Sequence, residues 1–239
     1  INVLFEDENI YVIHKPCGVN FHSTDDEQGI VQLVKQVRDN TEIYPVHRLD
    51  KMTSGLMIFA KNKQTNSELS QQFENKTIEK YYLGISLIKP AKKQGMVVGD
   101  MTKSRNGSYI LQRKKDKPAI TRFFASSFEL QKNQQAAGLK AWFFVLKPET
   151  GKTHQLRVAT KSLGSAIYGD TRYGKDKASR GYLHAYKIRF KLKGQLIEVL
   201  DPFMSGEEFD LEEIQNNETL APFLRPEKLG WSKAAFQVD

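Results

Sequence analysis

Strand-like segments outnumber helical ones, and this balance limits the fold more than any other feature of the sequence. Two apolar runs, at residues 3–5 and 10–13, flank a polar turn and predict a hairpin. Further strands are expected at residues 56–61, 78–87, 119–128, 139–147, 182–190 and 195–201. Helices are expected only over 28–38, 63–76 and about 153–163, and residues 90–118 should form a weakly paired hairpin or a long loop. Adjacent strands with few helices are typical of an α+β fold with a largely antiparallel sheet.

The segment IEKYYLGISL, at residues 78–87, carries more information than an ordinary strand. Successive side chains of a strand point to opposite faces, so Tyr81, Leu83 and Ile85 should share an apolar face. Lys80 and Tyr82 then lie on the opposite, more polar face. An aromatic ring on a polar face is a candidate for contact with a ligand.

Length and composition indicate a globular protein of one large domain or two small subdomains. The chain has 239 residues and is 39% hydrophobic. Apolar runs such as AWFFVL at residues 141–146 are far shorter than the roughly 20 residues that span a bilayer. No charged and then apolar leader opens the sequence, and the single cysteine, Cys17, cannot form an internal disulfide. We therefore expect a cytoplasmic protein with no membrane partner.

The formal net charge of +8 is unevenly distributed along the chain. Residues 204–224 contain six acidic residues and no Lys or Arg, so the rest of the chain carries +14. Clustered basic residues gain affinity for polyanions by releasing counterions from phosphates. A polyanionic partner such as nucleic acid is one explanation, and an ordinary basic surface is the other.

Two short segments concentrate the residue types that catalyse reactions. In PVHRLDKMTSGLMIFAK, residues 45–61, Asp50 stands among basic residues directly before small polar residues and an apolar strand. In PETGKTHQLRVATKSLG, residues 148–164, Thr153 is a predicted N-cap and Gly164 a predicted helix end. His154 and Arg157 would then lie in the first turns of the helix, where backbone N–H groups attract anions.

Several other classes of site find no support in the sequence. The GKT at residues 151–153 lacks the glycine that a phosphate-binding loop requires five residues earlier, since position 146 is leucine. The five histidines show no paired spacing typical of metal ligands, and no Cys-x-x-Cys or glycine-rich dinucleotide motif occurs. We expect neither a metal nor a cofactor.

Six segments in the same order resemble the RluA-type family of RNA pseudouridine synthases, over roughly residues 3–201. HRLDKMTSGL is similar to the family's catalytic H-R-L-D-x-x-T-S-G-L motif, IEKYYLGI to its E-K-x-Y strand, and TGKTHQLRV to its T-G-R-T-H-Q-[IL]-R segment. The other three landmarks are YVIHKPCGV, YGDTRYG and LHAYKIRF. Lys152, Met52 and the VAT at 158–160 depart from the family pattern, and the Asp, Tyr and Arg positions are retained.

The resemblance implies a fold and a biological role. The family has a central mixed, mainly antiparallel sheet in two subdomains, with the active-site cleft between them. We expect residues 1–203 to form the catalytic domain, divided near residue 90, and residues 204–239 to form an acidic C-terminal extension. The implied substrate is a uridine in structured RNA, either tRNA or rRNA. We expect a monomer that needs no obligatory protein partner and acts by flipping its target nucleotide out of the stack.

The resemblance also assigns roles to residues. Asp50 initiates the isomerisation, as nucleophile or as base, and Tyr82 packs on the uracil and can remove the C5 proton. Arg157 is expected to pair with Asp50, because a nearby guanidinium offsets the effect of burial on the carboxyl pKa. Arg48 should engage RNA, and Leu183 should line the uracil pocket. Four further candidates for contacts with phosphates, or with neighbouring protein groups, are Lys15, Lys80, Lys152 and His154. The TSG at residues 53–55 is expected to form a tight turn.

Two alternatives come from other functional classes. A protein that keeps this fold without catalysis would bind RNA as a folding or assembly factor, although it would not need Asp50, Tyr82 and Arg157. A metal-dependent nuclease could use Asp50 and Asp170, but the sequence lacks clustered carboxylates.

Overall fold

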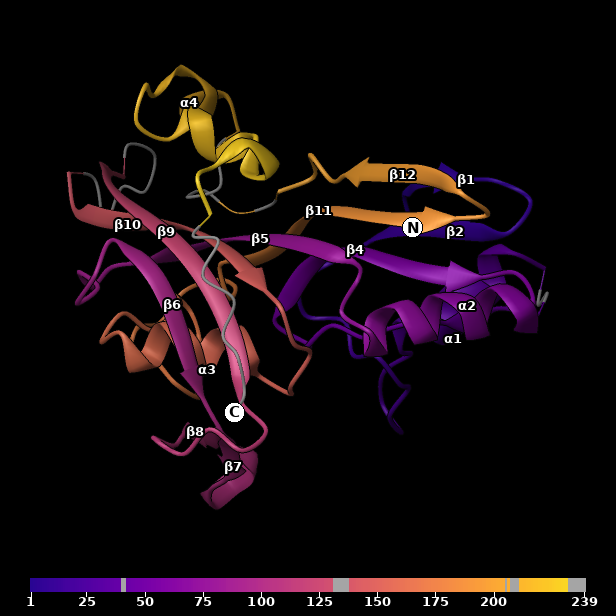
Figure 1. Ribbon diagram of the computed structural model, residues 1–239, viewed down its shortest axis with the longest axis horizontal. Coiled ribbons are helices and arrows are strands. Elements are labelled where there is room, and N and C mark those ends of the chain that lie inside the picture. The colour runs from indigo at the N-terminus through magenta and orange to yellow at the C-terminus, as the bar shows by residue number, and fades with distance from the viewer. Residues whose placement is uncertain (40–41, 131–137, 205, 207–210, 232–239) are drawn as a thin grey trace. The chain divides into compact units, whose positions relative to one another are not determined.

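The computed structural model describes residues 1–39, 42–130, 138–204, 206 and 211–231 (Figure 1). Its internal contacts divide the chain into two compact units, which we call the first and the second unit. The first unit joins Ile1–Lys80 to Leu183–Met204, and the second joins Tyr81–Tyr182 to the described part of Ser205–Asp239. The units are groups of residues in mutual contact, and they do not test where the catalytic domain begins or ends. The predicted division near residue 90 and the predicted extension after residue 203 therefore stay predictions.

The first unit contains a mixed sheet with strands in the order β1-β2-β4-β11, and β12 and β3 pair with β11 and β4. The strands are β1 (Val3–Glu6), β2 (Ile10–Lys15), β3 (Tyr44–Pro45), β4 (Thr53–Ala60), β11 (Leu183–Leu192) and β12 (Gln195–Leu200). Only the β11–β4 pair is parallel, and the other pairs are antiparallel. Every residue of β4 is buried, as expected for a central strand.

Two helices of the first unit bury their apolar faces, and Figure 1 shows both on the same side of its sheet. Helix α1 (Ile30–Val37) buries Ile30 and Val34, which are one turn apart. Helix α2 (Lys63–Glu74) begins after Asn62, whose side chain accepts a hydrogen bond from the Thr65 N–H at 2.8 Å. The predicted hairpin at the start of the chain and both predicted helices are therefore confirmed.

The second unit contains an antiparallel sheet with strands in the order β5-β10-β9-β6 and a separate β7–β8 hairpin. The strands are β5 (Glu79–Ser86), β6 (Gln94–Gly99), β7 (Met101–Lys103), β8 (Tyr109–Leu111), β9 (Ala119–Glu129) and β10 (Lys140–Pro148). The helical elements are α3 (Gln155–Ser162), α4 (Leu211–Asn216) and the 3₁₀ turns Arg105–Gly107, Ala221–Leu224 and Pro226–Lys228. A mixed sheet with a few helices confirms the predicted α+β class.

The two faces of the second sheet carry different elements. Gln155 of α3 donates a hydrogen bond to the Thr121 hydroxyl at 3.0 Å, so α3 lies on the face to which Thr121 points. On the opposite face, Trp231 packs edge-on against Phe124 at 4.8 Å between ring centroids and lies 6.1 Å from the Tyr81 ring. Phe223 and Trp231, from the described part of the C-terminal segment, therefore pack on the Phe124 face.

Three local predictions need correction. Residues 94–99 form a regular strand along β9, because β6 pairs with it over its whole length. The TSG at residues 53–55 lies inside β4, since β11 supplies a parallel partner for it. Helix α3 has His154 at its N-cap position in place of Thr153, and His154 has a left-handed backbone with a φ of 57°.

No helix in the described part of the chain has the length and hydrophobicity to cross a bilayer.

Candidate active site

Asp50 lies in the first unit on the turn between β3 and β4. The Thr53 N–H donates to the Asp50 carbonyl at 3.0 Å, which closes this turn directly before the buried strand. Asp50 is half-buried, Leu49 before it is buried, and Arg48 is exposed. The loop is thus anchored through Leu49, whereas Arg48, the candidate for contact with RNA, lies at the surface.

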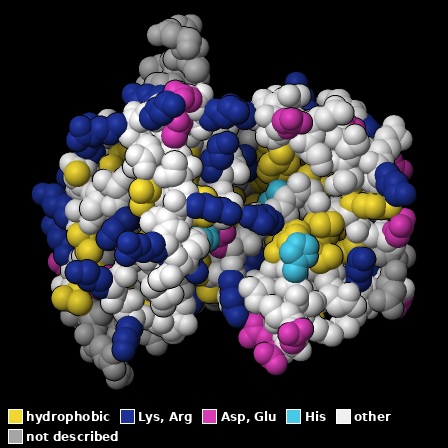
Figure 2. All heavy atoms as spheres, turned by 90° about the horizontal axis from the view of Figure 1, so that it is seen from below, with side chains coloured by type: hydrophobic (Ala, Val, Ile, Leu, Met, Phe, Trp, Pro, Cys, Tyr) yellow, Lys and Arg dark blue, Asp and Glu magenta, His cyan; other side chains and the backbone are white. Residues whose placement is uncertain are grey.

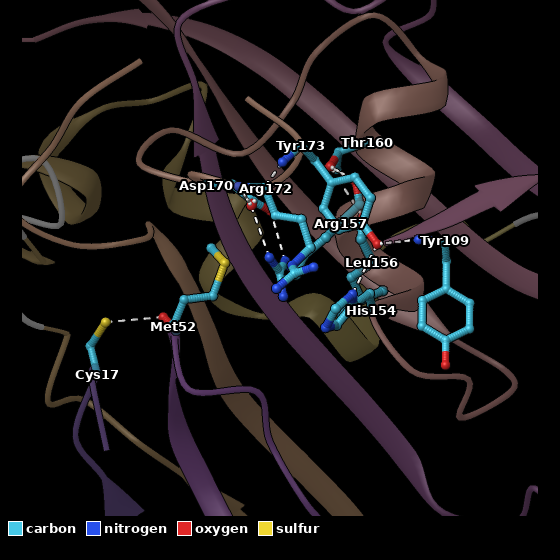
Figure 3. Close-up of polar contacts among 10 residues, drawn as sticks. All are labelled: Cys17, Met52, Tyr109, His154, Leu156, Arg157, Thr160, Asp170, Arg172 and Tyr173. Carbon is cyan, nitrogen blue, oxygen red and sulfur yellow. Dashed lines mark hydrogen bonds and ion pairs between the residues drawn. The ribbon is translucent and has the colours of Figure 1, made fainter. Parts of the chain in front are cut away.

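The buried ammonium group of Lys15 stabilises the loop that carries Asp50. Lys15 has no solvent-exposed surface, and its Nζ donates to the carbonyls of Pro16 and Val19 at 2.9 and 2.8 Å and approaches that of Lys51 at 3.4 Å. The Gly18 N–H also donates to the Lys51 carbonyl at 2.8 Å. The Cys17 thiol donates to the Met52 carbonyl at 3.0 Å (Figure 3). Residues 15–18 therefore fix the backbone immediately after Asp50.

His47 holds the other end of the same loop. Its Nε2 accepts the Ile58 N–H at 3.1 Å, and its ring stacks on Phe73 at 4.8 Å. Burial, reinforced by the charge of Lys80, lowers the pKa of His47 to about 3, so the ring is neutral and carries its proton on Nδ1. His47 is thus a hydrogen-bonded structural histidine.

Lys80, a predicted substrate-binding residue on β5, is buried. Its side chain lies with its ammonium 5.1 Å from the centroid of the Phe73 ring, and the residue is 8% exposed. Burial lowers the pKa of Lys80 to about 8. A buried ammonium group is better placed to contact neighbouring protein groups than a phosphate of the RNA. The role of Lys80 in substrate binding stays a prediction.

The start of β11 lies beside the start of β4. Leu183 pairs in register with Thr53, and Ala185 pairs with Gly55. Gly55 has a φ of 113°, and a Cβ there would lie 2.3 Å from the Ala185 carbonyl oxygen, so glycine is required. Leu183 therefore lies opposite Thr53, which follows Asp50 by three residues in the sequence. The Leu183 side chain is buried, with 2% of its surface exposed.

A buried polar network stabilises this junction. Ser54 Oγ and His184 Nδ1 are 2.8 Å apart, and His184 Nε2 lies 3.1 Å from the Asp201 carbonyl. The Asp201 carboxylate in turn binds His14 Nδ1 at 2.7 Å. Because all four residues are buried, each bond replaces a contact with water and fixes the relative register of β4, β11 and β2.

Arg157 lies in the second unit, on the first turns of α3. Its Nε and Nη2 donate to the two carboxylate oxygens of Asp170 at 2.7 and 2.9 Å (Figure 3). Both residues are buried, with Arg157 7% and Asp170 1% exposed. The Asp170 carboxylate also accepts the N–H groups of Arg172 and Tyr173 at 3.0 and 3.1 Å. A planar, bidentate pair of this kind fixes both the position and the orientation of the guanidinium.

The Tyr173 side chain completes the surroundings of Arg157. The Arg157 guanidinium carbon lies 5.0 Å from the centroid of the Tyr173 ring. The Tyr173 hydroxyl accepts the Tyr109 N–H at 2.8 Å and lies 2.9 Å from His154 Nδ1. Burial raises the pKa of Tyr173, so its hydroxyl is protonated at neutral pH. The segment YGDTRYG at residues 168–174 therefore surrounds the arginine that the sequence analysis selected.

The remaining candidates of the second unit lie at the start of α3 and on β5. Gln155 fixes the α3 start, since its amide oxygen accepts from the Thr150 hydroxyl and the Lys152 N–H at 2.7 and 3.0 Å. Lys152 is exposed, and His154 is half-buried. Tyr82 is paired in register with Leu146, and Leu146 with Phe123, so Tyr82 points to the same face of the sheet as Thr121 and α3. Tyr82 and Arg157 therefore belong to the same side of the second sheet.

The predicted residues thus fall into two groups. Asp50, Arg48, Leu183 and Lys80 belong to the first unit, and Tyr82, Arg157, Lys152 and His154 belong to the second. The expected pairing of Arg157 with Asp50 stays a prediction. No role was predicted for His47 or Tyr173, and Asp170 was considered only as a metal ligand. Lys15 was a candidate for contact with a phosphate or with neighbouring protein groups, and in the structure it is buried and binds backbone carbonyls. All four residues lie within three of the six segments that resemble the family, and this was the feature of the sequence that could have identified them.

The alternative of a metal-dependent nuclease receives no support. Among the residues that the structure describes, no group of three or more His, Cys, Asp or Glu side chains is placed to hold a metal ion. Both carboxylate oxygens of Asp170 are engaged by Arg157.

Comparison with known proteins identifies the family. Residues 9–162 match the family model described as RNA pseudouridylate synthase. A protein of Haemophilus influenzae described as an uncharacterized RNA pseudouridine synthase is 45% identical over 83% of this chain and 86% of its own length. Ribosomal large subunit pseudouridine synthase C of Rickettsia bellii is 33% identical over 88% of this chain and 67% of its own.

Solved structures agree with the sequence comparisons. The structure titled Human RNA Pseudouridylate Synthase Domain Containing 1 matches with a TM-score of 0.69 and 25% identity, over 84% of each chain. The structure titled Human RNA Pseudouridylate Synthase Domain Containing 4 has a TM-score of 0.67 over 84% of this chain and 87% of its own, and at 22% identity it supports the fold alone. The chain belongs to the RluA-type family of RNA pseudouridine synthases, and it is an RNA-modifying isomerase.

Proposed function

We propose that this enzyme converts a specific uridine of structured RNA to pseudouridine, with Asp50 as the residue that initiates the reaction. An rRNA uridine is the first candidate, because several relatives are named ribosomal large subunit pseudouridine synthase C, and a tRNA uridine is the second. The observation that carries the proposal is that the turn bearing Asp50 is held by hydrogen bonds. Lys15 and Gly18 both donate to the Lys51 carbonyl, directly after Asp50. We expect the protein to act as a monomer in the cytoplasm without an obligatory protein partner.

The reaction is an isomerisation in which atoms and electrons balance within the nucleotide. The bond between uracil N1 and ribose C1′ breaks, the base turns, and C5 forms a bond to C1′. C5 then loses its proton, and N1 gains one. Asp50 acts at the start, either as a nucleophile or as a base at the sugar, and both routes require an ionised carboxylate.

Arg157 is proposed to keep that carboxylate ionised. Burial raises the pKa of a carboxyl group, whereas a guanidinium within about 4 to 6 Å lowers it. A guanidinium has five N–H donors, and Asp170 accepts from the Nε and Nη2 atoms of Arg157. Binding to Asp170 therefore does not prevent Arg157 from donating to a second carboxylate. Because Asp170 neutralises much of the arginine's charge, we expect directed hydrogen bonds to contribute more than long-range attraction.

The target uridine must leave the base stack before Asp50 can reach C1′. Flipping costs a few kcal/mol of unstacking, which contacts to the flipped base must offset. We propose that Tyr82 packs on the uracil and removes the C5 proton, that Leu183 lines the uracil pocket, and that Arg48 engages the RNA near the vacated position. Tyr82 is half-buried and faces the side of the sheet that carries α3, which suits this role.

The second unit offers a basic surface for the phosphate backbone. Figure 2 shows Lys and Arg side chains gathered over the face that includes β7 and β8. The exposed cations of the hairpin, of the loop after Asp170 and of the segment before α3 are Lys103, Arg105, Lys152, Arg172, Lys175 and Lys177. The Arg172 guanidinium binds the Asn106 carbonyl, which joins the loop to the hairpin. We propose that this surface supplies the salt-dependent part of RNA affinity.

The test is pseudouridine mapping of total cellular RNA from cells with the gene, without it, and with Asp50→Asn in its place. We expect one or a few uridines to lose the modification without the protein and to regain it only with Asp50 intact. Restoration by the Asp50→Asn variant would refute the role of Asp50. If no site changed, the non-catalytic RNA-binding alternative would replace the proposal.

A further inference from the structure

One loop residue contacts both the arginine and the basic hairpin in the second unit. Tyr173 places its ring against the Arg157 guanidinium and its hydroxyl against the backbone of Tyr109, the first residue of β8 (Figure 3). Its own N–H donates to the Asp170 carboxylate that binds Arg157. Tyr173 is 8% exposed, so these contacts are largely shielded from water.

The Tyr173 hydroxyl forms hydrogen bonds with two separate elements. The Tyr109 N–H can only donate, so the hydroxyl oxygen accepts that bond at 2.8 Å. The same hydroxyl pairs with His154 Nδ1 at 2.9 Å, as donor or as acceptor according to the tautomer of His154. A single hydroxyl group satisfies one group on the hairpin and one at the N-cap of α3.

The loop that carries Tyr173 has little room to adjust. Gly169 has a φ of 75°, and a Cβ there would lie 1.9 Å from the Arg180 carbonyl oxygen. The Gly174 N–H donates to the Asp170 carbonyl at 2.8 Å, which closes the turn between the two residues. Tyr173 and Asp170 therefore move together, and displacement of one displaces the other.

We propose that Tyr173 is a positioning residue for Arg157, and that its hydroxyl ties the RNA-facing β7–β8 hairpin and the start of α3 to that arginine. The inference rests on the proposed function, in which Arg157 acts beside Asp50 and the hairpin contacts RNA. The ring of Tyr173 limits sideways movement of the guanidinium, and the Asp170 pair sets its plane. The hydroxyl keeps helix α3 in register with the loop.

The experiment compares Tyr173→Phe, Tyr173→Leu and Tyr11→Phe with the natural protein on the RNA found by mapping. Tyr173→Phe removes the hydroxyl and keeps the ring, whereas Tyr173→Leu removes both. Tyr11→Phe is the matched control, because it makes the same chemical change on β2 of the first unit, where the Tyr11 ring lies against Arg38 and Lys61. Each variant is tested for its single-turnover rate constant at saturating enzyme, its Kd for the RNA and its Tm.

We expect the rate constant to fall about tenfold in Tyr173→Phe and about a hundredfold in Tyr173→Leu, since sub-ångström placement of a catalytic group controls such rates. The Kd should change less than about twofold, because every cationic side chain remains. Tyr11→Phe should match the natural protein. A partly unfolded preparation lowers the amplitude of a single turnover and leaves its rate constant unchanged, so a merely structural role is distinguishable.

Two results would overturn the inference. An active natural protein with a rate constant within about twofold in both Tyr173 variants would show that Arg157 does not depend on Tyr173. A loss of activity that appears only as a weaker Kd would assign Tyr173 to RNA binding alone. If Tyr173→Leu does not fold, the isosteric Phe variant decides by itself. A natural protein that modifies no uridine would instead refute the proposed function, and this inference with it.

Discussion

The Asp50 turn and the Arg157 cluster both hold a charged side chain in place, but they do so by different means. In the first unit, the braces of the Asp50 turn act on the backbone: Lys15 binds three carbonyls, and His47 binds the Ile58 N–H. In the second unit, the Asp170 carboxylate and the Tyr173 ring act on the Arg157 side chain itself. A short side chain such as Asp is positioned once its backbone is fixed, whereas a long arginine side chain needs partners along its length.

The comparison predicts the largest stability loss where a buried charge loses its partner. Asp170→Ala should lower the free energy of unfolding by about 3 to 5 kcal/mol, because the Arg157 guanidinium would remain buried without its carboxylate. Asp170→Asn, which keeps an oxygen acceptor, should lose less. Urea-induced unfolding of both variants provides the measurement. A loss under about 1 kcal/mol in Asp170→Ala would show that Asp170 is not the main anchor of Arg157.

A smaller loss is expected for the backbone brace. Lys15→Met keeps most of the side-chain volume but removes the ammonium from the carbonyls of Pro16, Val19 and Lys51. We expect a loss of about 1 to 3 kcal/mol, the penalty typical of buried polar groups that lose a partner. Hydrogen exchange should also quicken at the Gly18 and Thr53 amides, which close the neighbouring turns. Unchanged exchange at both amides would contradict a brace at this position.

The pH dependence of stability tests His47. Its pKa falls from an ordinary 6.5 to about 3 on folding, so the unfolded chain binds the proton more readily. Stability from the neutral ring is therefore complete above pH 6.5 and is lost as the pH falls toward 3. With allowance for partial exposure, we expect His47 to account for about 1 to 2 kcal/mol of the loss between pH 6.5 and 4.

Replacement of His47 by Gln isolates this contribution from the other histidines. Unfolding free energies of the natural chain and of His47→Gln, measured across the same pH range, should converge as the pH falls. Parallel curves would mean that His47 is not held neutral by the fold.

The smallest effect per residue concerns the basic surface of the second unit. Replacing Lys103 and Arg105 together by Gln should reduce the slope of log K against log salt concentration for RNA binding by about 1 to 2, because two phosphate contacts are lost. Lys63→Gln, at an exposed position of the first unit, is the matched control and should leave the slope unchanged. Equal slopes in all three proteins would place the RNA contacts elsewhere.

Much of the architecture could be predicted because strand and helix periodicity is local. The long strands β9 and β10, the helix α3 and the final β11–β12 pair all lie close to their predicted positions. The errors occurred where a distant partner decides the structure. The TSG segment is a strand because β11 lies beside it, and Ser54 and His184 of this pair are 130 residues apart in the sequence.

The sequence by itself determined the family, through six motifs in order, and it selected Asp50, Tyr82 and Arg157 as the residues to test. Only the tertiary structure decided what holds them: Lys15 beneath the Asp50 turn, Asp170 against the Arg157 guanidinium, and Tyr173 between α3 and β8. Lys15 and Lys51 are 36 residues apart, and Tyr109 and Tyr173 are 64. No spacing rule connects such pairs, because buried polar groups take whichever partners the folded chain brings within hydrogen-bonding distance.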